Sequence, residues 1–142
     1  MKKSAQVNEL HEKAMKIAQA AFIARTQGKL ENVKQLSYQA FEYERQAAML
    51  LLNDYDVEPT RSVLFRSAAN LALNFENYRE AECMIALGLL GNPPPEILEE
   101  LRELFISNIP VQTKPIPISL SQFPTSRFSF PMRTTNIKHV AL

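Results

Sequence analysis

The sequence predicts an all-α protein built from stacked helix pairs. Two stretches of the 142-residue chain align on each other at an offset of 48 residues, with an apolar or small residue at both members of each matched pair. The matched positions include Ala21 with Ala69, Leu30 with Tyr78, and Ala40 with Gly88. Within each stretch, apolar residues recur at steps of three and four, as on one buried face of a helix. Repeated helix pairs of this kind share one core and leave a surface free for partners.

The first pair is expected to span residues 4–26 and 30–53. Ser4 can cap the first helix, and Gly28 interrupts its apolar pattern. Since only a few residues separate the two patterns, they are expected to form an antiparallel hairpin.

The second pair is expected at residues 59–74 and 78–91, after a loop rich in Asn, Asp and Pro. Pro93, Pro94 and Pro95 then end one helix and start the next, because proline cannot continue a helix but suits its first turn. A short fifth helix, 95–105, has apolar residues on one side and glutamates on the other, which is typical of an element that caps a helical array.

The chain is expected to divide into a helical domain, 1–106, and a tail, 107–142. All 15 acidic residues lie at or before Glu103, together with 12 basic ones, whereas the tail has four basic residues and no acidic one. The tail also contains five of the nine prolines and shows no helical period. We therefore expect it to be mostly disordered.

The two helix pairs resemble the tetratricopeptide repeat, a unit of about 34 residues that forms two antiparallel helices. The resemblance is carried best by the second copy, through Ala69, Tyr78, Ala81 and Pro93. The stretch from Leu10 to Leu104 further resembles a family of small, uncharacterised bacterial tetratricopeptide-like proteins. This resemblance implies two stacked hairpins and a capping helix in a right-handed α-solenoid, and it implies no chemistry.

Composition argues against several classes of function. A single cysteine, Cys83, excludes an intramolecular disulfide and a multi-thiolate metal site. No export signal or membrane-spanning run is visible, so a cytoplasmic protein is expected. His11 and Glu12 begin like a helical zinc motif, but Met15 stands at the second ligand position, and a solvated helix face explains them better. Catalytic residues, metal ligands and a cofactor are therefore not expected.

The best candidate site is the face formed by the first helix of each pair, which lines the groove in this repeat type. The resemblance places Phe22 and Arg25 there in the first copy, and Arg66 and Asn70 in the second. In some tetratricopeptide repeats, a basic residue and an asparagine at the positions of Arg66 and Asn70 bind a partner's terminal carboxylate. The alternative is that Arg66 makes only a surface ion pair, with Glu58 or Asp56.

Three classes of function follow from these observations. The first is an adaptor or scaffold that binds a partner protein or peptide in the helical groove, with homodimerisation as an option because two hairpins make a short array. The second is a nucleic-acid accessory factor that uses the basic tail, although neither half of the chain has clustered Lys and Arg. The third is an enzyme or metal protein with a site in the helical interior, against which the lack of paired histidines argues.

Overall fold

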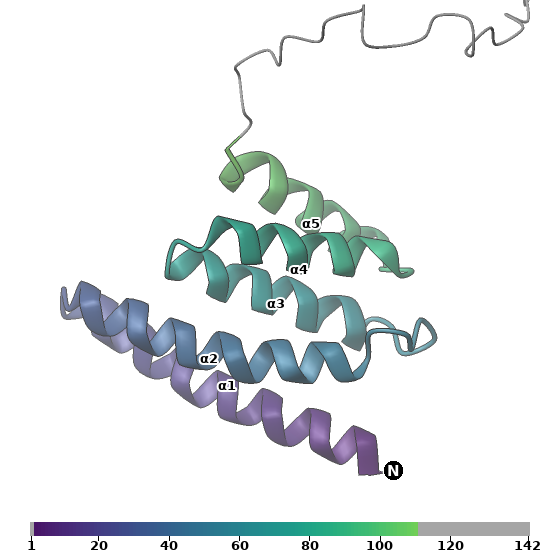
Figure 1. Cartoon of the computed structure of the whole chain (residues 1–142), viewed down its shortest axis with the longest axis horizontal. Helices are drawn as coiled ribbons and strands as arrows, with labels where there is room; N and C mark the ends of the chain where they lie inside the picture. Colours follow the sequence, from purple (N-terminus) through teal and green to yellow (C-terminus); the bar gives the residue numbers. More distant parts are fainter. Residues whose placement is uncertain (1, 111–142) are drawn as a thin grey trace, which may run out of the picture. The chain divides into compact units, whose positions relative to one another are not determined.

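The computed structural model describes residues 2–110 as five consecutive α-helices (Figure 1). No strand occurs among these residues, and the prediction of an all-α protein is confirmed for them. The helices are α1 (Lys2–Thr26), α2 (Leu30–Leu50), α3 (Thr60–Asn74), α4 (Tyr78–Leu90) and α5 (Pro95–Asn108). The expected tail lies outside the described residues except for 107–110, and α5 continues into it as far as Asn108.

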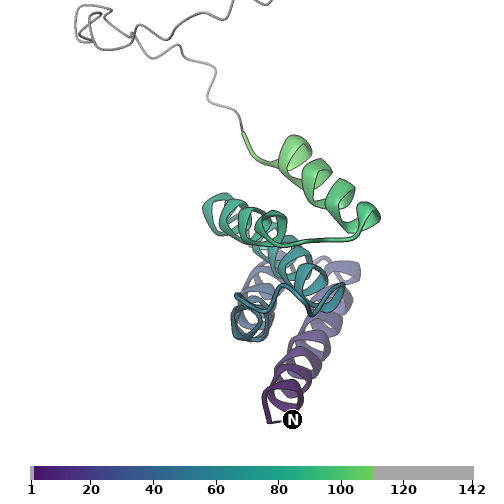
Figure 2. The same cartoon turned by 90° about the vertical axis from the view of Figure 1, so that its right-hand side faces the viewer.

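Each helix packs against the next one along the chain, and α3 also packs against α5. Figure 2 shows α2 and α4 along one side of this unit and α1 and α5 along the other, with α3 between them. The connections at 27–29, 75–77 and 91–94 are turns of a few residues, which leave little other place for the next helix to pack. The helix ends agree with the predicted ones to within three residues.

The turn inside each pair has the same backbone geometry at the 48-residue offset. Gly28 and Glu76, which are 48 residues apart, are the two described residues with φ clearly in the left-handed region, at 73° and 61°. Directly after them, the N–H of Lys29 donates to the carbonyl of Ala24, and the N–H of Asn77 donates to that of Ala72, both at 3.0 Å. A left-handed residue followed by such a bond is a common way to end a helix. The sequence repeat is therefore also a structural repeat at its two turns.

Small residues allow the helices to approach closely in the core. Ala68, Ala69 and Ala81 have no solvent-exposed surface. A Cβ atom added at Gly88 on α4 would lie 3.1 Å from a methyl group of Leu101 on α5 and 3.2 Å from the Cβ of Phe65 on α3. Gly88 therefore sits where three helices meet, as its small size in the sequence pattern indicates.

Candidate functional site

Phe22 and Arg25 of α1 line a hollow of about 190 Å³ whose other walls come from α2 and α3. The Phe22 side chain is 67% exposed, although a phenylalanine ring usually gains free energy by burial. The Arg25 guanidinium donates to the Oδ1 of Asn74 on α3 at 3.2 Å. This bond holds one wall of the hollow across two helices that are not consecutive in the chain.

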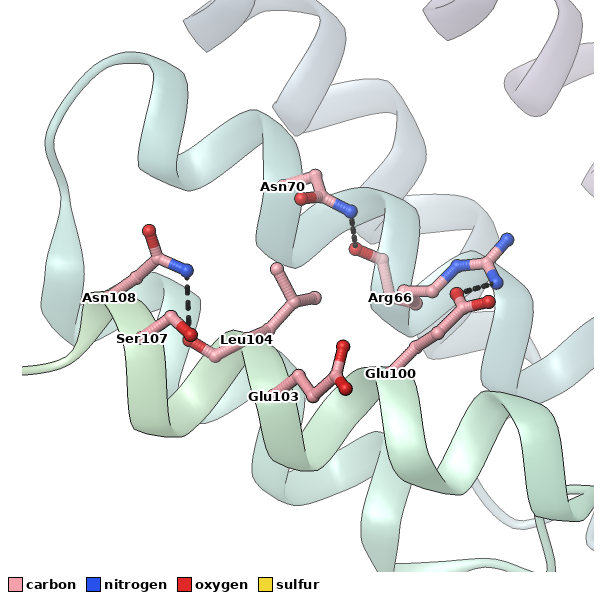
Figure 3. Close-up of a pocket in the computed structure, with 7 residues that line it drawn as sticks. All are labelled: Arg66, Asn70, Glu100, Glu103, Leu104, Ser107 and Asn108. Atoms are coloured by element: carbon pink, nitrogen blue, oxygen red, sulfur yellow. Dashed lines mark hydrogen bonds and ion pairs between the residues drawn. The ribbon is translucent and has the colours of Figure 1, made fainter.

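Arg66 and Asn70 line a different pocket, between α3 and α5, with a volume of about 270 Å³ (Figure 3). The Arg66 guanidinium forms a close ion pair with Glu100 of α5. The amide nitrogen of Asn70 donates to the backbone carbonyl of Arg66 at 3.2 Å. The rest of the lining also comes from α5 and consists of Glu103, Leu104, Ser107 and Asn108.

The four predicted residues therefore belong to two hollows on either side of α3. Phe22 and Arg25 share theirs with Leu71 and Asn74 of α3, whereas Arg66 and Asn70 face α5. The structure brings each predicted pair together, and it separates the two pairs into adjacent recesses of one face.

Arg66 does form a surface ion pair, as the alternative interpretation held, but the partner is Glu100 and neither Glu58 nor Asp56. Glu58 accepts hydrogen bonds from the backbone N–H and the hydroxyl of Ser62, at 3.1 and 2.6 Å. Its other oxygen faces Arg61, at 3.9 Å. Glu58 therefore bonds to residues in the first turn of α3. The partner of Arg66 comes from α5, whose packing could not be derived from local sequence.

The Glu100 pair changes what the pocket can do chemically. A partner carboxylate that binds Arg66 would have to displace or share it with Glu100, so the guanidinium is not a free anion site. Glu103 adds a second negative charge, and it forms no ion pair with any residue that the structure describes. Counting Arg66, Glu100 and Glu103, the lining carries one net negative charge.

A buried carboxylate between the helices was missed by the sequence analysis. Glu44 of α2 has no exposed surface, and both of its carboxylate oxygens lie near the Nδ1 of His11 on α1, at 3.1 and 3.0 Å. Burial raises the pKa of the Glu44 carboxyl, and hydrogen bonds from His11 and Ser67 offset part of that rise. The expected solvated face is confirmed for Glu12, which is exposed, and only in part for His11, whose half-buried ring joins α1 to α2.

A buried arginine was missed as well. Arg61, in the first turn of α3, has no exposed surface; its Nε donates to the carbonyl of Leu52 at 3.1 Å, and its second terminal nitrogen to that of Leu87 at 2.9 Å. The guanidinium lies 5.0 Å from the ring centroids of both Tyr55 and Phe65. It therefore ties the loop after α2 to the last turn of α4 and has a structural role.

Residues 2–110 contain neither a membrane-spanning helix nor a metal-binding cluster. No helix in this part of the chain is both long enough and apolar enough to cross a bilayer. Nowhere in the same residues do three or more His, Cys, Asp or Glu side chains come together as a metal site would require.

Comparison with known proteins found no matching family model, no similar curated protein and no similar solved structure. The function must therefore be argued from the geometry of this chain.

Proposed function

We propose that this protein is an adaptor that binds a partner protein or peptide on the face formed by α1, α3 and α5, and that its helix pairs form a solenoid of the tetratricopeptide type. The observation that carries this proposal is the pair of adjacent recesses on either side of α3, about 190 and 270 Å³ in volume. Alternate helices contribute their side chains to one face, which is how helical repeats present an extended binding surface.

The character of the exposed residues supports this proposal. Phe22 offers a large exposed aromatic ring, of the kind that anchors protein interfaces, next to the arginine of the same recess. Arg66 and Asn70 add polar groups in the second recess. An apolar anchor beside polar groups is a common arrangement in sites that bind polypeptides.

The charge of the helical part favours a protein partner over nucleic acid. Residues 1–106 contain 15 acidic and 12 basic residues, and one of the basic residues, Arg61, is buried. Phosphate binding requires a positively charged surface. The basic segment on which the nucleic-acid alternative depends lies largely outside the described residues.

The proposal is tested by affinity capture with the full chain and matched variants, followed by mass spectrometry. The double variant Phe22→Ala/Asn70→Ala removes one exposed side chain from each recess, and both sites are open enough that folding should not suffer. Arg79→Ala is the control, because Arg79 is an arginine of α4 that is 77% exposed and lines neither recess.

We expect the same partner to be retained by the wild type and by Arg79→Ala. Its affinity should fall at least tenfold in the double variant, since truncating the anchor residues of an interface costs more than about 1 kcal/mol. Circular dichroism of each variant shows that helicity is kept. Equal capture by all three proteins would place the binding surface elsewhere and overturn the proposal.

A further inference from the structure

Two side-chain amides in the pocket between α3 and α5 each donate one N–H to the backbone of their own helix. The amide nitrogen of Asn70 donates to the carbonyl of Arg66 at 3.2 Å, and the amide nitrogen of Asn108 donates to the carbonyl of Leu104 at 3.1 Å (Figure 3). A backbone carbonyl can only accept, so these bonds fix the orientation of both amides. The amide oxygens of Asn70 and Asn108 therefore stay available as acceptors.

The charges of the pocket, like its free amide oxygens, favour a ligand that donates hydrogen bonds. The Arg66 guanidinium is balanced by Glu100, with which it forms a close ion pair at one end of the pocket. Glu103 extends from α5 toward the same space and has no cationic partner among residues 2–110. The pocket thus presents one unbalanced carboxylate and two amide oxygens.

The remaining surface of the pocket suits an aliphatic chain. Leu104 projects from α5 between the polar groups and is half-buried. Lysine side chains commonly lay their methylene groups along apolar surface while the ammonium group reaches polar partners. An ammonium group has three donors and no acceptor, which suits the Glu103 carboxylate and the two amide oxygens.

We propose that this pocket binds a lysine side chain of the partner polypeptide, so that the groove selects basic segments and does not capture a terminal carboxylate. The ammonium group would lie between Glu103 and the amide oxygens of Asn70 and Asn108, with its methylene chain on Leu104. This inference rests on the proposed function, because it names the chemistry of the polypeptide that the α1, α3 and α5 face would hold.

The test uses the full chain labelled with nitrogen-15 and three short synthetic peptides. The first is an acetylated and amidated alanine pentapeptide with a central lysine; the second replaces that lysine by norleucine, which keeps the methylene chain without the charge. The third is an acetylated alanine pentapeptide with a free terminal carboxylate. Titrations follow the side-chain amide signals of Asn70 and Asn108.

We expect only the lysine peptide to shift these signals saturably. Glu103→Gln should weaken its binding about fivefold or more, because it removes the charge from one hydrogen-bond acceptor. Glu96→Gln is the matched control: Glu96 is an exposed glutamate in the first turn of the same helix and does not line the pocket, so binding should be unchanged.

Preference for the carboxylate peptide, equal binding of the norleucine peptide, or no shift with any peptide would each overturn the inference. None of these results bears on the capture experiment with Phe22→Ala/Asn70→Ala. The proposed function can therefore hold while the lysine pocket fails, and the two failures can be told apart.

Discussion

Replacing Arg61 by methionine should lower the free energy of unfolding by about 3 to 5 kcal/mol, the usual cost of breaking a buried, paired charge. Methionine is unbranched and apolar, so it can fill much of the same space without a donor. Its introduction leaves the carbonyls of Leu52 and Leu87 without the bonds that now reach them at 3.1 and 2.9 Å. Two carbonyls at element ends would become unsatisfied at once.

The size of the effect follows from three contributions. Each hydrogen bond from a charged donor is typically worth about 1.5 to 3 kcal/mol. Glu58, with a side chain only 12% exposed, would also lose the guanidinium that lies 3.9 Å away. Contacts of the methionine with the rings of Tyr55 and Phe65 would recover part of the loss, because both rings already pack against the side chain at position 61.

Urea denaturation followed by circular dichroism measures this loss, and Arg66→Met serves as the matched control. Arg66 lies on the same helix but is 26% exposed and pairs with Glu100 at the surface, so its loss should cost less than about 1 kcal/mol. Should Arg61→Met prevent folding altogether, Arg61→Lys provides a milder change that keeps the charge but not the two-carbonyl geometry. Equal loss in the two methionine variants would refute the structural role of Arg61.

Two further predictions concern Glu44 and Glu76. Burial raises the pKa of Glu44 above its usual 4.5, so the folded state binds this proton more tightly than the unfolded chain, and the stability linked to protonation is lost as pH rises from 4.5 through the raised pKa. Glu44→Gln should therefore gain stability relative to the wild type over that interval in urea titrations at several pH values, and a pH-independent difference would contradict this. Glu76→Gly should raise the melting temperature, because glycine relieves about 1 kcal/mol at a φ of 61°, more than the exposed ion pair with Lys34 contributes. Glu76→Ala, which loses the same pair but keeps the left-handed backbone, should give no gain, and a similar rise in both variants would show that backbone strain is not the cause.

Helix positions were predictable because the apolar period and the turn residues indicate the same boundaries. Gly28 and the prolines at 93–95 mark helix ends by their backbone properties alone, which need no tertiary information. The end of α5 was placed three residues early, because Ser107 and Asn108 lie next to a proline-rich segment and carry no apolar signal.

The burial of Arg61 and Glu44 was harder to predict than the helix positions, although both residues lie in apolar stripes of the sequence. Arg61 precedes Leu64 and Phe65 by three and four residues, so it lies in their apolar stripe, and Glu44 lies in the same way between Ala40 and Ala47. Charged residues are almost never fully buried unless paired. The partners that allow their burial come from other elements and become visible only in the structure.

The candidate site was predictable to the level of the helix face and no further. The repeat placed Arg66 and Asn70 on one side of α3, and the structure puts both in one pocket. What faces them depends on the packing of α5, 34 residues further along the chain from Arg66 to Glu100. Because that contact decides the charge of the pocket, its ligand preference could not be derived from the local motif.

The contact between Gly91 and Arg61 affects the order in which substitutions at these two positions can occur during evolution. A methyl group at position 91 would overlap the Arg61 guanidinium, so alanine there requires the guanidinium to shift from its bonds to Leu52 and Leu87. A smaller residue at position 61 would remove the clash, but it would first forfeit the bonds to Leu52 and Leu87. Changes at these two sites are therefore coupled: with Arg61 in place, alanine at 91 costs more stability than it would beside a smaller residue at 61, and either change made first passes through a less stable chain.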